Sequence, residues 1–155
     1  MLETPHVLVG AAIAVKVGHP LLAIPLAFTS HFLLEQIPHW NPHLKKETDR
    51  FGQPTPKSTA IVVIDSTLAL ISGSLIAFTR LPDIGFAVTV LLSSLAAVLP
   101  DLVEAPYFFL IVRHNRLINR WIKFQKNLQV NAAPLPGLAT QLVVILATLG
   151  WILAK

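Results

Sequence analysis

The sequence predicts an all-α polytopic integral membrane protein: a helical bundle of four to five membrane segments plus an interfacial amphipathic helix. Of the 155 residues, 54% are hydrophobic and only 13% are charged, whereas an average soluble domain is about 25% charged. A chain of this length cannot bury so much apolar surface in one soluble core. Its apolar residues also form long runs, as helices that cross a membrane require. We therefore expect a single integral membrane domain over residues 1–155.

The composition also excludes several classes of function. An ordinary soluble enzyme, a disordered chain and a nucleic-acid-binding domain do not carry this much apolar sequence. The chain has no cysteine, which excludes a disulfide framework, a thiolate metal site and a cysteine nucleophile. The net charge of +4 comes from basic residues in short loops, a pattern that fits the positive-inside rule of membrane proteins. The expected partner is therefore membrane lipid and not nucleic acid.

The first two apolar segments cover residues 5–17 and 20–37. As a helix, residues 5–17 would reach roughly 20 Å, which is short of a hydrocarbon core of about 30 Å. That segment either crosses with the help of a snorkelling Lys16 or re-enters on the same side. Residues 20–37 would reach roughly 27 Å and span, and Pro38 closes them. The polar, proline-containing stretch 41–57 predicts a loop.

Three more apolar segments follow at residues 58–79, 84–112 and 136–154. Residues 58–79 are the clearest span. Residues 84–112 would be roughly 43 Å long as one helix, too long for the core. We expect Pro100 and Pro106 to break or kink that helix.

Residues 113–131 alternate apolar and basic side chains at helical spacing, which predicts an interfacial helix on the membrane surface. Basic residues also fill the loop 41–57, whereas the connection between residues 79 and 84 carries only Arg80. By the positive-inside rule both basic loops are cytoplasmic. An even number of crossings separates them, as this orientation requires.

Ionisable residues inside membrane segments are rare and are candidates for function. This chain carries His6, His31, Glu35, His39, Asp65, Asp101 and Glu104 in or at the edge of its apolar segments. His31, Glu35 and His39 are spaced i, i+4, i+8, so they share one helix face if the helix tolerates Pro38. Asp101 and Glu104 are spaced i, i+3 and also share a face. The topology, deduced from Lys and Arg alone, places all of these residues in the cytoplasmic leaflet, which predicts one convergent site.

A bound metal would balance the charge of this site. The carboxylates Glu35, Asp65, Asp101 and Glu104 have no Lys or Arg in their own apolar stretches, and each would cost about 2.5–3.5 kcal/mol near the bilayer centre. Either protonation or a bound cation would relieve that cost. The histidines favour the cation, and imidazole with carboxylate suits zinc, iron or manganese. All the candidate residues together exceed one tetrahedral site, so we expect one or two divalent ions.

Three stretches carry a resemblance to a known family. They are Thr4-Pro5-His6-x₃-Gly10, Ser30-His31-Phe32-Leu33-Leu34-Glu35-x₂-Pro38-His39-Trp40 and Leu99-Pro100-Asp101-x₂-Glu104. They resemble the early His, S-H-x-x-x-D-x-x-P-H-type and L-P-D motifs of small prokaryotic membrane-bound metal-dependent hydrolases. Glu35 stands where that family usually has Asp, and no G-H-R-G-x-T-H-S-type motif is found. The resemblance implies a metal-dependent hydrolase in the prokaryotic cytoplasmic (inner) membrane.

Three functions fit these residues. The first is a metal-dependent hydrolase of a lipid or lipid-linked phosphoester, with Glu35 or Glu104 as general base or ligand. The second is a proton or divalent-cation transporter or channel that uses the same residues as a relay. The third is a structural or assembly protein whose polar residues only hold helices together. For His6 alone a hydrogen bond at the helix start, and for Asp65 alone a protonated carboxyl near Ser66, are competing interpretations.

Overall fold

The fold is all-helical, as the sequence predicts. The structure is a computed structural model that describes residues 1–110 and 115–154, and within these ranges it contains helices and no strand. In chain order the helices are α1 (Glu3–Val17), α2 (Pro20–Leu34), α3 (Leu44–Phe51), α4 (Pro56–Phe78), α5 (Ile84–Phe109), α6 (Arg116–Leu128) and α7 (Pro134–Leu153).

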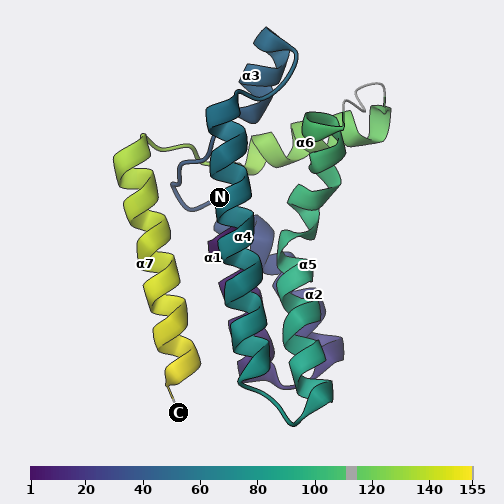
Figure 1. Cartoon of the computed structure of the whole chain (residues 1–155), viewed down its shortest axis with the longest axis vertical. Coiled ribbons are helices and arrows are strands. Elements are labelled where there is room, and N and C mark those ends of the chain that lie inside the picture. Colours follow the sequence, from purple (N-terminus) through teal and green to yellow (C-terminus); the bar gives the residue numbers. More distant parts are fainter. Residues whose placement is uncertain (111–114, 155) are drawn as a thin grey trace.

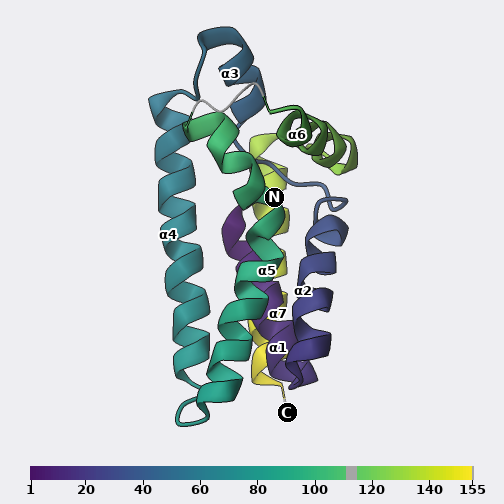
Figure 2. The same cartoon turned by 90° about the vertical axis from the view of Figure 1, so that its right-hand side faces the viewer.

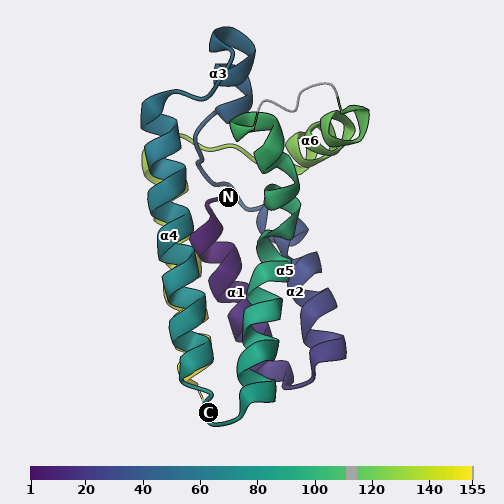
Figure 3. The same ribbon diagram turned by 45° about the vertical axis from the view of Figure 1, so that its right-hand side comes forward.

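Helix α1 lies at the centre of the bundle and packs against α2, α4, α5 and α7. Figure 1 shows the long helices α4, α5 and α7 running along the long axis of the molecule. Figures 2 and 3 show that α1 and α2 fill only the lower part of the bundle, with the amino end of α1 between α4 and α5. The short helices α3 and α6 lie beyond that end. Residues of α3, α4, α5 and α6 line a cavity beyond the amino end of α1.

Three helices in the described part of the chain are long and apolar enough to cross a membrane, namely α4, α5 and α7. Helix α2 is apolar but shorter, and α1 and α2 have 15 residues each. A helix of that length reaches about 22 Å, less than a hydrocarbon core of about 30 Å. The structure thus supports a membrane bundle with three clear candidate spans, fewer than the four to five expected.

The outer faces of the candidate spans are apolar and uncovered. On α4, Leu70 and Phe78 are 72% and 70% exposed, and on α7, Leu135 and Leu153 are both 82% exposed. Large apolar side chains exposed in this number mark an interaction with lipid or another apolar partner rather than with water. This surface indicates a membrane protein.

Small residues allow α1 to sit inside the bundle. Ala11 and Ala14 of α1 pack with Ala23 of α2 and Val90 of α5, all fully buried. At Gly10 a Cβ would come within 2.6 Å of the backbone oxygen of Ser93, so the glycine permits close contact between α1 and α5. Interfaces of small residues are typical of helices packed in membranes.

Two expectations are wrong, the end of the second helix and the absence of a helix from residues 41–57. Helix α2 ends at Leu34 rather than Ile37, and Val130 N donates to the carbonyl of Glu35 just beyond it. The stretch 41–57, expected as a loop, contains α3, which ends at Gly52 in the left-handed conformation. The prolines that suggested a loop lie outside α3, so they do not interrupt its hydrogen bonds.

Helix α5 is one element from Ile84 to Phe109, so Pro100 and Pro106 do not break it. Its upper part leans away from α4 in Figure 1. The indole of Trp121 in α6 donates to the carbonyl of Pro100 at 3.0 Å and supports the helix there. Helix α6 falls within the interfacial helix expected over residues 113–131. Residues 111–114, shared between that expectation and the segment 84–112, lie outside the described residues.

Candidate metal centre

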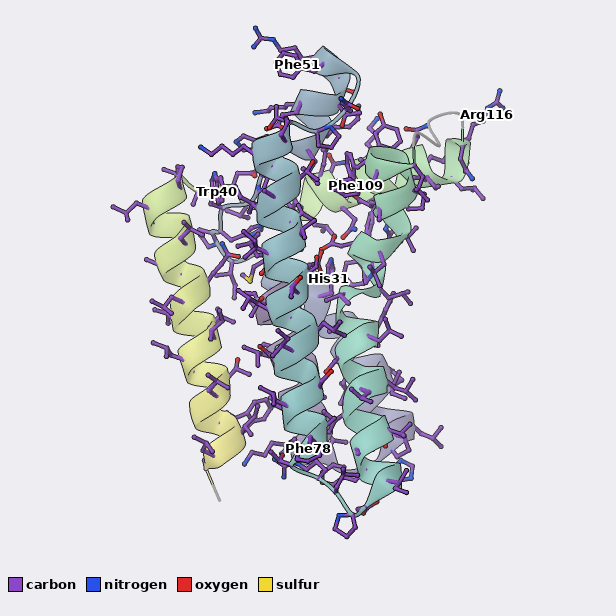
Figure 4. The ribbon with its side chains drawn as sticks, in the orientation of Figure 1. His31, Trp40, Phe51, Phe78, Phe109 and Arg116 are labelled. Carbon is purple, nitrogen blue, oxygen red and sulfur yellow. The ribbon has the colours of Figure 1, made fainter. Side chains whose placement is uncertain are left out.

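His6 of α1, His31 of α2 and Asp101 of α5 form a group that could hold a metal ion. One donor atom from each residue lies within 4.8 Å of the others. Both histidine side chains are fully buried and the Asp101 side chain is 21% exposed. The two imidazole rings stack with centroids 4.2 Å apart. Figure 4 labels His31 at mid-height in the bundle, at the level where α1 begins.

The hydrogen bonds of the two histidines differ in what they leave for a ligand. Nδ1 of His31 donates to the carbonyl of Ala97 at 2.9 Å, while its Nε2, 3.8 Å from Asp101, lies 2.9 Å from the side-chain oxygen of Gln125, which a metal ion would have to displace. Nε2 of His6 contacts Glu35 at 3.2 Å, while Nδ1 of His6 is buried without a hydrogen-bond partner in the described part of the chain. A carbonyl or carboxylate on one nitrogen commonly orients the other nitrogen of a metal-binding histidine. The donor set therefore fits a divalent transition metal.

Glu35 and His39 extend this group on the side of α2. Glu35 is 1% exposed, and its second oxygen lies 3.6 Å from Nε2 of His39. The amino group of Met1 also contacts Glu35. His39 does not continue the face of α2, because that helix ends before it, so the expected i, i+8 alignment with His31 is wrong. Instead, backbone hydrogen bonds join His39 to Val130 and Ala132 and place its ring beside Glu35.

Gln125 of α6 joins the centre to Glu104 and was not expected from the sequence. Its amide nitrogen donates to Asp101 at 3.2 Å and to Glu104 at 3.0 Å. Its amide oxygen lies 2.9 Å from Nε2 of His31. Gln125 and Ile122 are each 2% exposed, and their i, i+3 spacing puts both on the buried face of α6. That spacing is the sequence signal that could have identified Gln125.

Asp65 of α4 lies apart from the histidines and holds the start of α1. Its carboxylate accepts hydrogen bonds from Glu3 N at 2.5 Å, from Thr4 N at 3.3 Å and from the Thr4 hydroxyl at 2.7 Å. Thr4 lies inside α1, and the N-cap Leu2 makes no side-chain hydrogen bond to the helix. Asp65 therefore satisfies the first amides of α1 from a neighbouring helix.

A cavity of about 560 Å³ lies beside the centre, and several acidic residues line it. Glu3, Asp65, Asp101 and Glu104 line it. The sequence did not identify Glu3, because it precedes the first apolar segment. Its oxygen Oε2 is buried and has no hydrogen-bond partner among residues 1–110 and 115–154. Asp101 belongs both to the centre and to the wall of this cavity, so the cavity and the centre adjoin at that residue.

The structure therefore sorts the sequence-predicted residues by their contacts. His6, His31 and Asp101 form the possible metal group, Glu35 and His39 lie against it, Gln125 connects Glu104 to it, and Asp65 caps α1.

Comparisons of the chain with models of known families, with curated proteins and with solved structures found no match.

Proposed function

We propose that this chain is a membrane-embedded metal-dependent hydrolase of a lipid or lipid-linked phosphoester. The observation that carries the proposal is the pair of buried, oriented histidines beside Asp101, adjoining a cavity large enough for a small-molecule group. The donor set favours zinc, iron or manganese. The resemblance of the motifs to membrane-bound metal-dependent hydrolases supports the same reaction class.

In this proposal each acidic residue has a separate task. A bound metal would lower the pKa of a water ligand and polarise a phosphoryl oxygen. Glu104 lines the cavity within hydrogen-bond reach of Gln125 and serves as the general base that takes a proton from water. Glu35 lies behind His6, where it orients the ring. In a phosphate monoester the water oxygen forms a bond to phosphorus as the bond from phosphorus to the lipid oxygen breaks. Glu104 returns its proton to that leaving oxygen, and the products are a lipid alcohol and inorganic phosphate.

The proposed setting is the cytoplasmic membrane of a prokaryote. Helices α4, α5 and α7 would cross the bilayer, with the basic residues of α3 and α6 on the cytoplasmic side. Helices α1 and α2 would supply the remaining segments of a four- to five-segment bundle. Each reaches from the turn at residues 18–20 to the level of the metal centre (Figure 2).

Release of inorganic phosphate from a lipid phosphate monoester tests this function. The protein in lipid nanodiscs, loaded with manganese or zinc, is expected to hydrolyse phosphatidic acid. Glu104→Gln should abolish turnover and retain the metal, because Glu104 lies outside the His6–His31–Asp101 group. Glu47→Gln on α3 is the control and should keep full activity. If the metal-loaded protein releases no phosphate from any of several lipid phosphates, the hydrolase proposal fails.

A second candidate, transport of protons or divalent cations, is favoured by the continuity of the titratable contacts. His39 lies 3.6 Å from Glu35, Glu35 lies 3.2 Å from His6, and the His6 ring stacks on His31. Such a row could pass protons or hold ions in transit. Flux into proteoliposomes that is lost in Glu35→Gln but kept in Glu47→Gln would support this candidate. Equal leak through both variants would reject it.

A further inference from the structure

The cavity beside the metal centre is acidic at its base and basic at its rim. The acidic residues come from α1, α4 and α5, whereas the rim carries Lys45 and Lys46 of α3 and Lys126 of α6. Helices α3 and α6 lie beyond the amino end of α1 in Figures 1 and 3. A cation at the base and an anion at the rim would each meet side chains of opposite charge.

The three rim lysines come from two distant helices, α3 and α6, and line one cavity. Lys45 forms an ion pair with Asp49, one turn away on α3. Lys46 and Lys126 form no ion pair within residues 1–110 and 115–154. Burial and the neighbouring Lys45 ammonium lower the pKa of Lys126 below its ordinary value. Like charges held together in this way favour the binding of an anion.

One wall of the cavity is apolar and continues to the outer face of the bundle. Val62 of α4 and Leu102 and Phe109 of α5 line this wall. Leu102 is 46% exposed and Phe109 is 39% exposed, so both also face the surroundings of the molecule. Figure 4 labels Phe109 at the upper end of α5, near the level of α6. A ligand with an apolar tail could leave the cavity along this wall.

We propose that this cavity binds the phosphate monoester headgroup of a lipid, with Lys45, Lys46 and Lys126 contacting the phosphate oxygens. The acyl chains would leave along the apolar wall between α4 and α5. Ammonium groups bind phosphate as point charges, and the volume of about 560 Å³ lies within the usual range for ligand sites. The inference rests on the proposed function, because the carboxylates at the base would repel phosphate unless a cation neutralised them.

Lipid retention measured by native mass spectrometry tests this site. The metal-loaded protein is released from detergent micelles doped with equal amounts of phosphatidic acid and phosphatidylcholine. Wild-type protein should retain phosphatidic acid preferentially. Lys46→Gln and Lys126→Gln should each reduce that preference about tenfold, the usual effect of losing one charged hydrogen bond. The matched controls are Lys57→Gln on α4 and Lys123→Gln on α6, which lose the same charge outside the cavity.

Two further measurements complete the test. One distinguishes binding of a lipid phosphate from binding of free phosphate, and the other distinguishes failure of the headgroup site from failure of the proposed hydrolase. Millimolar inorganic phosphate should not displace phosphatidic acid, since the apolar wall adds contacts that free phosphate lacks. Equal binding of free phosphate and phosphatidic acid would overturn the lipid assignment.

Metal content is measured on the same samples. If the rim variants keep both metal and phosphatidic acid, the headgroup site is wrong while the metal centre stands. If no metal binds and wild-type protein still retains phosphatidic acid through the rim lysines, the headgroup site stands without the hydrolase.

Discussion

The side-chain oxygen of Gln125 lies 2.9 Å from Nε2 of His31, so the amphipathic helix α6 contacts the most deeply buried part of the candidate centre. The amide nitrogen of the same residue donates to Asp101 and Glu104. Helix α6 also buries Ile122 against Tyr107 and Phe108 of α5. The position of α6 and the geometry of the centre are therefore coupled.

Loss of the Gln125 amide should weaken metal binding. Gln125→Ala removes hydrogen bonds that orient Asp101 and Glu104, and the loss of such orienting partners typically lowers metal affinity by about 10- to 100-fold. Asn127→Ala, an exposed polar residue on the same helix, is the control. Competition titration against a metal-sensitive dye measures both affinities. Equal affinity in the two variants would show that Gln125 does not orient the centre.

Asp65 should act on stability rather than on metal content. Asp65→Ala leaves the amides of Glu3 and Thr4 without their acceptor and should cost about 0.5–2 kcal/mol. Asp65→Asn should recover most of that loss, because an amide oxygen also caps helices well. Thermal unfolding in detergent and metal analysis are measured on both variants. Loss of metal from a folded Asp65→Asn protein would instead make Asp65 a ligand.

Opposite effects are expected from two glycine-to-alanine substitutions. In Gly10→Ala the new methyl group would meet Ser93 O at 2.6 Å and Ala97 Cβ at 2.8 Å, which forces α1 away from α5. In Gly150→Ala the methyl group would meet no atom within 4 Å, and alanine favours the helix by about 0.8–1.0 kcal/mol. The melting temperature should therefore fall for Gly10→Ala and rise or stay constant for Gly150→Ala. A matching rise in both would contradict the close packing of α1.

Glu47 should make part of the stability of the fold depend on pH in the acidic range. Burial alone would raise its pKa, but hydrogen bonds from Thr55 N and the Ser58 hydroxyl, both 2.7 Å, hold the pKa below the ordinary value of 4.5. A carboxyl with a depressed pKa stabilises the fold above its unfolded pKa and loses that effect as the pH falls through its folded pKa.

The measurement compares the melting temperatures of wild type and Glu47→Gln at pH 7 and near pH 3. The wild type should be more stable at pH 7, and the difference should narrow in acid. Asp49→Asn, an exposed carboxylate on the same helix, should show a smaller change. A difference between wild type and Glu47→Gln that is the same at both pH values would show that these hydrogen bonds do not favour the charged form.

The sequence predicted the helical class and the members of the polar cluster better than their geometry. Helix periodicity and the rarity of charge in apolar segments depend on local sequence, so both can be read without a structure. The route of His39 to the centre depends on a backbone bridge to Asn131, far away in the chain. No local pattern encodes that bridge, and the helical face extrapolated from His31 was therefore wrong.

The polar contacts between residues of different helices could also not be predicted from the sequence. The sequence did not distinguish Gln125 within the helix expected over residues 113–131, although its side chain is buried. Asp65 was considered only as an ionisable group in a span, whereas the amides that it satisfies belong to α1. Long-range pairing of this kind follows from how helices pack, and packing is decided by the whole chain.

The metal content of purified protein tests the central claim most directly. Elemental mass spectrometry is applied to wild type, His6→Ala, His31→Ala and Asp101→Asn, with the exposed His19→Ala as the control. Protein purified without chelator is predicted to carry one or two equivalents of zinc, iron or manganese. The three site variants should lose metal while remaining folded, and His19→Ala should keep it. A folded wild-type protein that binds none of these metals, even after they are added, would contradict the account.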